Sequence, residues 1–207
     1  GTYTYYAVYP VPATVSGTNV SYTLSDRQDG KSSGGEDIIV SAAAVGGPLA
    51  AIDWKFYGHE EMQLSMDHIL HRLRFYTEEE DALGGEPVKR IVASFPKAVT
   101  GGISFDVANP SAAVVSASGS TITIEPDEPV AVSDADNRHY LTASIFPTAF
   151  VQSDVMTVAL YTDTKVARAT IPLKGRSFAA GHSTPVKIVP QTVGSHYQIS
   201  FNLASNN

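Results

Sequence analysis

The chain contains no cysteine among its 207 residues, and it has a single tryptophan. Without thiols it can form neither a disulfide scaffold nor a thiolate zinc site, and it has no cysteine nucleophile. No apolar run approaches the roughly 18 residues that a membrane-spanning helix requires. No signal-peptide pattern is present either. Gly1 is not a natural first residue, so we expect a processed or engineered fragment from which a leading signal or lipid-anchor segment was removed.

Clustered positive charge is also missing. The formal net charge is −7, with an isoelectric point near 5.3. Lys and Arg are scattered, and the densest basic group, Arg72, Arg74, Lys89 and Arg90, is offset by the acidic residues 78–81. Non-specific nucleic-acid binding needs grouped cations that neutralise phosphates. We therefore predict no nucleic-acid partner.

The motifs of common enzyme classes are absent. The sequence has no G-x-S-x-G nucleophile elbow, no G-x-x-x-x-G-K phosphate loop and no G-x-G-x-x-G dinucleotide fingerprint. Ser, His and Asp occur in no order that would define a catalytic triad. We predict no catalytic residues and no cofactor. A β-sandwich glycoside hydrolase with paired carboxylates is the weakest alternative.

Short strand signals fill the chain instead. Ile122 and Ile124 alternate with polar neighbours, and residues 196–203 alternate strictly. A period of two is the mark of a strand with one buried face. Gly, Pro, Asn and Asp separate these segments, as in a β-sandwich. The predicted strands are residues 3–9, 20–24, 38–45, 88–95, 103–107, 112–117, 121–125, 130–133, 140–146, 155–161, 166–173, 186–189 and 196–203.

Residues 66–76 are compatible with two structures. One interpretation is a helical stripe of Met66, Ile69, Leu70 and Leu73, and the other is a strand face of Ile69, His71, Leu73 and Phe75. The Phe-Tyr-Thr ending and the acidic turn that follows favour the strand. His68 and His71 would share a face of a helix and could then hold a metal, but they point to opposite faces of a strand. We expect one packed and one solvated histidine.

Other candidate metal ligands fail on spacing. Residues 59–63 begin like the zinc motif H-E-x-x-H, but Gln63 replaces the second histidine. The acidic residues 78–81 lack the alternating ligands and the glycine of a calcium loop. Asp127, Glu128, Asp134 and Asp136 are typical turn residues. We predict no metal site.

The aromatic side chains offer one alternative function. Trp54 and Tyr57 could stack on sugar rings, which would make the chain a cell-surface glycan-binding module. Packing in a core is the default interpretation of such residues. The sequon that begins at Asn19 occurs often by chance and carries little weight.

The sequence has no internal repeat, and its best boundary is near residue 62, where aromatic residues meet a charged segment. About 60 residues are few for an independent sandwich, which usually has about 100. We expect residues 1–62 to be an incomplete or reduced first β region and residues 63–207 to be a C-terminal β-sandwich domain.

Three segments in the expected order resemble the fimbrillin family of the Bacteroidales, the subunits of type V pili. Residues 5–10 resemble the family's aromatic YYAxYP strand, and residues 66–75 resemble its F/M-x-H-x-L-A-x-L-x-F strand. The ending of the family's second domain is matched by residues 140–147, 155–161, 171–173 and 178–181. The resemblance covers nearly the whole chain. The chain departs from the family at its start, because only four residues precede the aromatic strand.

The resemblance implies an all-β protein with a transthyretin-like antiparallel β-sandwich, preceded by part of a second sandwich. It implies export to the outer-membrane surface, attachment to the membrane only through a removed lipid anchor, and assembly by β-strand donation. An open sheet edge beside an apolar groove is a template for an incoming strand. The expected partners are other pilus subunits or copies of this chain, and a host or bacterial receptor or glycan. The strand-exchange candidates are Tyr3, Tyr5, Val8, Tyr197, Ile199, Phe201 and Leu203.

Overall fold

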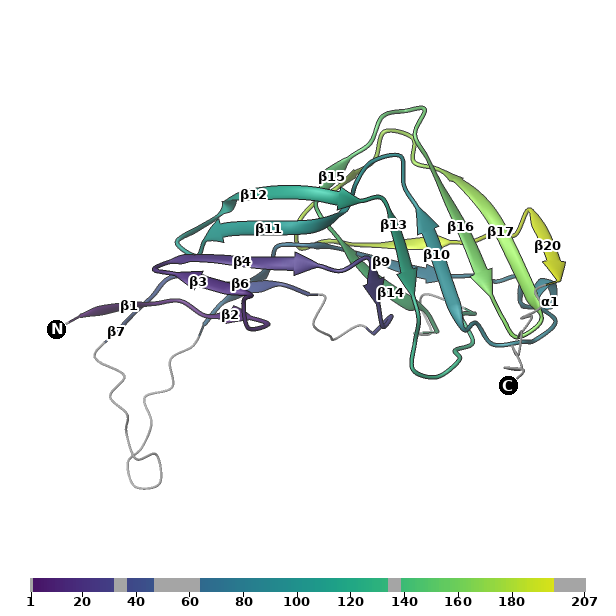
Figure 1. The fold of residues 1–207 in the computed structure, drawn as a ribbon, viewed down its shortest axis with the longest axis horizontal. Coiled ribbons are helices and arrows are strands. Elements are labelled where there is room, and N and C mark those ends of the chain that lie inside the picture. Colours follow the sequence, from purple (N-terminus) through teal and green to yellow (C-terminus); the bar gives the residue numbers. More distant parts are fainter. Residues whose placement is uncertain (1, 32–36, 47–63, 134–138, 196–207) are drawn as a thin grey trace, which may run out of the picture.

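The computed structural model describes residues 2–31, 37–46, 64–133 and 139–195 (Figure 1). In these ranges the chain is mostly β, with several antiparallel sheets and one four-residue helix. Before the helix the strands are β1 (Tyr3–Tyr5), β2 (Val8–Tyr9), β3 (Thr14–Ser16), β4 (Asn19–Leu24), β5 (Arg27–Gln28), β6 (Ile39–Ser41), β7 (Ala44–Gly46), β8 (Met66–His68) and β9 (His71–Tyr76). After α1 (Glu80–Leu83) come β10 (Arg90–Ser94), β11 (Thr100–Asp106), β12 (Asn109–Gly119), β13 (Thr121–Ile124), β14 (Leu141–Ile145), β15 (Thr148–Ala149), β16 (Val155–Tyr161), β17 (Lys165–Pro172), β18 (Ser177–Phe178), β19 (Ser183–Lys187) and β20 (Thr192–Ser195).

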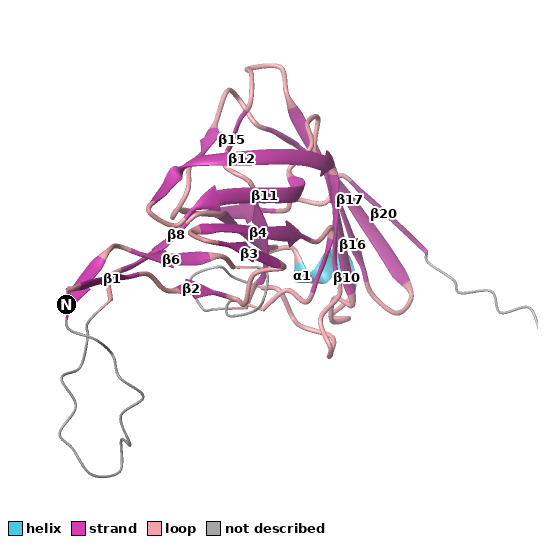
Figure 2. Cartoon of the chain, turned by 60° about the vertical axis from the view of Figure 1, so that its left-hand side comes forward, coloured by secondary structure: helices cyan, strands magenta, loops and turns pink. Residues whose placement is uncertain are grey.

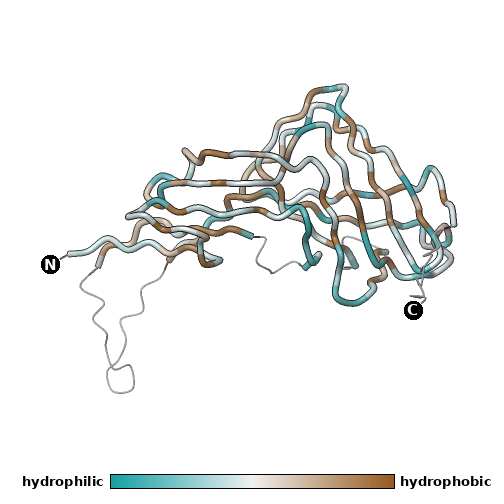
Figure 3. The backbone as a smooth tube through the Cα atoms, in the orientation of Figure 1, coloured by the Kyte–Doolittle hydropathy of each residue, from teal (hydrophilic) through white to brown (hydrophobic). Residues whose placement is uncertain are grey.

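The larger hydrophobic core lies between two sheets. One has six strands in the order β20-β17-β16-β10-β13-β5, and the other has the order β14-β9-β19. Alternate residues of β10, β13 and β16 point into this core, and the alternation can be followed in Figure 3. Leu73 and Phe75 of β9 enter it from the opposite sheet. Burial of one face of each strand therefore holds the two sheets together.

A second, smaller core lies beneath a four-stranded sheet of order β12-β11-β4-β3. Val20, Tyr22 and Leu24 come from β4, and Ile103 and Phe105 come from β11. The rings of Tyr22 and Phe105 stack with their centroids 6.0 Å apart. The Tyr22 hydroxyl donates to the carbonyl of Pro10 at 3.0 Å, which ties the N-terminal segment to this sheet. Figure 2 shows the strands of this sheet lying one above another.

Strands on both sides of residue 62 share sheets. β4 pairs antiparallel with β11, and β5 pairs parallel with β13. A second parallel pair joins β19 to β9, so the antiparallel pattern expected from the sequence has two exceptions. The division of the chain at residue 62 stays a prediction.

Most predicted strands are confirmed, and several differ in their bounds. The segment predicted at residues 3–9 is two strands with different partners, because β1 pairs with β7 and β2 with β6. Residues 66–76 are strands, as the sequence favoured, but Ile69 and Leu70 interrupt them. The segment predicted at 130–133 is reduced to a bridge between Val88 and Val130.

The acidic turn after β9 contains the helix α1, which the sequence analysis did not predict. Its four residues make one helical turn, and Leu83 at its end is buried in the larger core. Burial of that leucine explains why the turn closes over the sheet rather than remaining open. In the described part of the chain, no helix has the length and apolar character needed to cross a membrane.

Candidate functional site

Tyr3 and Tyr5, two of the predicted strand-exchange candidates, lie on the short strand β1. Its three residues pair only with β7 among the described strands, in a two-stranded sheet at the N-terminal end of the molecule (Figure 1). Tyr3 is 52% exposed, and its ring lies 6.3 Å from that of Tyr5. Val8 belongs to β2 and is half-buried against the smaller core. The three candidates thus lie on two strands, and Tyr3 is the least buried of them.

A second open edge, which the sequence analysis did not single out, is formed by β12. With 11 residues, β12 is the outermost strand of the four-stranded sheet, and its only strand partner in the described ranges is β11. It carries no charged side chain. Natural edge strands usually carry lysine, proline or a bulge that discourages pairing with another chain. Pro110 stands at its second position, and its pairing with β11 shifts register near both ends, whereas Val114–Ala117 pair without interruption.

The smaller core is incompletely covered beside this edge. Val115 lies opposite Ile103 of β11 and therefore on the same face of the sheet. Ile103 is 4% exposed, whereas Val115 is 41% exposed. Val114, on the other face, is 65% exposed. A strand added next to β12 would gain main-chain hydrogen bonds and would cover Val115. The sequence signal that could have revealed this edge is the uncharged run of residues 107–124, within which β12 lies.

The remaining predicted residues lie outside the described ranges. This applies to the strand-exchange candidates Tyr197, Ile199, Phe201 and Leu203 and to the glycan-stacking candidates Trp54 and Tyr57. Their roles stay predictions.

The histidine pair behaves as the strand interpretation predicted. His71 is buried, and its ring stacks on Phe178 with the centroids 4.7 Å apart. Its Nδ1 and Nε2 lie 2.8 and 2.9 Å from the Ala179 carbonyl and the Thr184 hydroxyl. Burial lowers the pKa of His71, and nearby His182 acts in the same direction against the Ala179 hydrogen bond.

His68 is exposed and has an acidic partner that sequence spacing did not reveal. Its Nδ1 lies 2.8 Å from Oδ2 of Asp37, and Nη2 of Arg72 lies 2.6 Å from the same oxygen. Asp37 precedes His68 by 31 residues and approaches it because β6 pairs with β8. The described residues contain no group of three or more His, Asp or Glu side chains able to hold a metal ion.

Two of the acidic turn residues, Glu78 and Asp127, each pair with a lysine. Glu78 pairs with Lys187, and Asp127 lies 2.7 Å from Nζ of Lys31. The lysine lowers the pKa of Asp127, chiefly through the hydrogen bond that it donates. Asp134 and Asp136 lie outside the described ranges. Exposed pairs of this kind contribute little stability, so their main effect is to orient the loops.

No protein-family model matches the chain, and no curated protein matches it. Its fold is similar to that of solved structures from Bacteroides species. One is a candidate cell adhesion protein from Bacteroides uniformis, with a TM-score of 0.55 and 14% identity, covering 93% of this chain and 70% of that protein. Another is a candidate cell adhesion protein from Bacteroides ovatus, with a TM-score of 0.52 and 17% identity, covering 95% of this chain and 67% of that protein. The chain is thus a β-rich protein with the fold of candidate Bacteroides cell adhesion proteins.

Proposed function

We propose that this chain is a structural and adhesive subunit of a bacterial surface pilus, related to the fimbrillins and assembling by β-strand donation. The transthyretin-like sandwich, display at the outer-membrane surface and the absence of catalysis belong to the same proposal. The observation that carries it is the uncharged open edge of β12, with Val115 of the adjoining core still 41% exposed. The fold shared with candidate cell adhesion proteins supports it.

The donated strand is a terminal segment of a neighbouring copy. Residues 196–203 place Tyr197, Ile199, Phe201 and Leu203 at alternate positions. One face of such a strand would cover apolar surface while its backbone extends the sheet. The first strand is the other candidate, because β1 is short and pairs only with β7 among the described strands.

The absence of cysteine makes a clean crosslinking experiment possible. Ala117→Cys on β12 is combined with Ser200→Cys in the last segment, and in a second variant with Thr4→Cys on β1. Each variant is expressed in the source cells. A ladder of disulfide-linked oligomers on a non-reducing gel would support strand donation, and the variant that gives it identifies the donor. The single-cysteine variants are the controls and can give dimers but no ladder.

Immunogold electron microscopy of the same cells supplies the second readout. Label along filaments supports a shaft subunit, and label at filament ends supports a tip or anchor subunit. Val115→Lys should abolish the filaments, because a charge on the edge opposes strand addition. The matched control is Val193→Lys on the edge strand β20, which should leave them intact. Absence of filaments together with absence of crosslinked oligomers in all variants would refute the proposal.

A further inference from the structure

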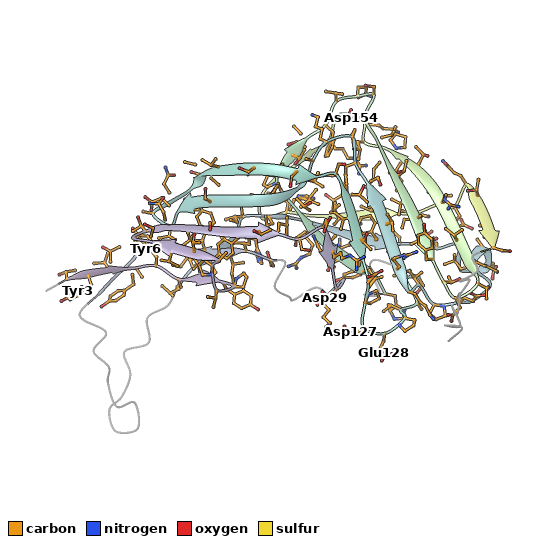
Figure 4. The ribbon with its side chains drawn as sticks, in the orientation of Figure 1. Tyr3, Tyr6, Asp29, Asp127, Glu128 and Asp154 are labelled. Carbon is orange, nitrogen blue, oxygen red and sulfur yellow. The ribbon has the colours of Figure 1, made fainter. Side chains whose placement is uncertain are left out.

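A hollow of about 440 Å³ lies at one end of the six-stranded sheet, where Arg90 begins β10 and Tyr161 ends β16. Its lining includes Lys89, Arg90, Glu125, Asp127, Tyr161 and Asp163. A volume of this size is within the range of about 300–1,000 Å³ that is usual for small-molecule sites. Figure 4 shows Asp127 and Glu128 in the loop beyond β13, near Asp29.

The floor of the hollow is a row of side chains that crosses adjacent strands. Arg90 of β10 is the register partner of Tyr161 of β16. Because Ile91 pairs with Ile124, the next residue, Glu125, lies beside Arg90 on its other side. Ile91, Ile124 and Leu160 are fully buried, so their neighbours along each strand face outward. Pairing of strands thus places an aromatic ring, a guanidinium and a carboxylate side by side.

Contacts within the row hold these groups in place. The Arg90 guanidinium lies over the Tyr161 ring, 4.1 Å from its centroid. One of its terminal nitrogens is 3.8 Å from a carboxylate oxygen of Glu125, and the other oxygen of Glu125 is 3.5 Å from Arg27. A stacked and paired guanidinium is more ordered than a free one, so binding a ligand to it costs less conformational entropy.

The charges of the lining decide which ligand fits. Two cations, Lys89 and Arg90, stand beside three carboxylates, those of Glu125, Asp127 and Asp163. Lys89 pairs with Asp163, and Asp127 with Lys31. A phosphate or carboxylate ligand would be repelled by the carboxylates, which outnumber the cations. A cationic ligand would be repelled by the arginine and the lysine. A neutral molecule whose hydroxyls both donate and accept can use both kinds of partner.

Apolar surface adjoins these polar groups. Pro126 and Pro129 contribute to the lining beside Tyr161. The C–H faces of a pyranose ring match such surface, while its hydroxyls match the carboxylates and the guanidinium. We propose that this hollow binds a neutral saccharide of one or two sugar rings. The site differs from the one predicted at Trp54 and Tyr57, and it does not depend on assembly by strand donation.

The test is a titration of the full chain followed by two-dimensional ¹H–¹⁵N NMR. The probes are cellobiose, lactose and maltose, with glucuronic acid as the anionic and glucosamine as the cationic comparator. At least one neutral disaccharide should shift the amide signals of Arg90, Glu125 and Tyr161 in a saturable way. Its affinity should exceed that of both charged sugars.

Two variants and one control assign the binding to the hollow. Arg90→Ala should weaken binding at least about tenfold, because hydrogen bonds to charged groups are among the strongest. Asp127→Asn should weaken it less and leaves the sheet untouched, since this side chain is 76% exposed in a loop. Arg168→Ala should leave binding unchanged. Arg168 lines a separate hollow of about 320 Å³ on the same face of the sheet, and that hollow contains no carboxylate.

Three outcomes would overturn the proposal. They are the absence of saturable shifts with all three disaccharides, equal or tighter binding of glucuronic acid, and equal effects of the Arg90 and Arg168 variants. None of these would affect the crosslinking and microscopy that test assembly. Failure of the saccharide site and failure of the proposed pilus function are therefore distinguishable.

Discussion

The side-chain amide of Gln28 pairs with the backbone of Ser144 as a neighbouring strand would. Its Nε2 donates to the Ser144 carbonyl at 2.9 Å, and its Oε1 accepts from the Ser144 N–H at 2.8 Å. Gln28 is 5% exposed. These residues are 116 positions apart, so a single glutamine links β5, at the edge of the six-stranded sheet, to β14 of the opposite sheet.

We predict that Gln28→Leu lowers the free energy of unfolding by about 2–4 kcal/mol. The leucine would leave a buried N–H and a buried carbonyl without partners, at about 1–3 kcal/mol for each group. Chemical denaturation measures the change. Gln191 is a matched control, because its amide pairs with the Thr170 backbone in the same way but is exposed. Gln191→Leu should cost at most about 0.5 kcal/mol, since water replaces the lost bonds. Equal losses in the two variants would contradict the argument.

His71 should make stability depend on pH below neutrality. Its folded-state pKa is lowered from the ordinary value of 6.5, chiefly by burial. The unfolded chain therefore takes up a proton first as the pH falls. The contribution of neutral His71 is complete above pH 6.5 and decreases as the pH falls below that value.

To test this, the free energy of unfolding is measured in assays at about pH 7.5 and about pH 5. The difference between the two values is then compared for the parent chain and for the His71→Gln variant. The variant should be less stable at the higher pH, and its loss of stability on acidification should be smaller. A His71→Gln variant with an unchanged dependence would show that other groups cause it.

Gly30 and Gly85 should respond differently to alanine. Both have positive φ, at +77° and +74°, where an alanine costs about 1–2 kcal/mol. An added Cβ at Gly30 would lie 2.7 Å from Leu141 and 2.8 Å from Ile124, which are both buried, whereas none of the described atoms lies within 4 Å at Gly85. Gly30→Ala should therefore lower the free energy of unfolding by about 2–4 kcal/mol in a thermal unfolding experiment. Gly85→Ala should lower it only by the about 1–2 kcal/mol that the positive φ costs. Equal melting temperatures for the Gly30→Ala and Gly85→Ala variants would contradict this prediction.

Glu86 should titrate far below an ordinary glutamate. Hydrogen bonds from Thr162 and Thr164 lower its pKa to about 2. Its carboxylate contribution to stability is complete above the ordinary value of 4.5 and is lost as the pH falls toward about 2. NMR titration of its side-chain carbon should show this midpoint. Thr162→Val should raise the pKa of Glu86, while Thr192→Val on β20 should not. If the titration midpoint of Glu86 were the same in the Thr162→Val variant, the hydrogen bond from Thr162 would not be the cause of the lowered pKa.

The sequence predicted the elements whose side chains alternate and missed those that depend on distant backbone. Ile122 and Ile124 alternate with polar residues, and β13 lies there as expected. No strand was predicted at β5, because its two residues become a strand only by pairing with β13. The ends of β12, Asn-Pro-Ser and Ser-Gly, lack an apolar pattern, so the predicted strand was shorter than the 11 residues of β12.

The candidate site shows the same limit. The spacing of His68 and His71 correctly separated a buried from an exposed histidine. The open edge of β12 depends on which strand lies outermost in its sheet, and sheet order is a tertiary property. The row of Tyr161, Arg90 and Glu125 likewise comes from β16, β10 and the residue after β13, which lie apart in the chain. Periodicity within one segment carries no information about such neighbours.

The pairing of β4 with β11 has a consequence for the newly made chain. β4 leaves the ribosome or the export channel long before β11, whose first residue lies 76 positions after the end of β4. Until then β4 has only the three-residue strand β3 beside it in its sheet, and contacts of such high sequence separation as those with β11 form slowly. We expect a holding chaperone to bind the emerging N-terminal segment. It should be released once the chain has emerged as far as residue 106, because the whole of β11 can then pair with β4.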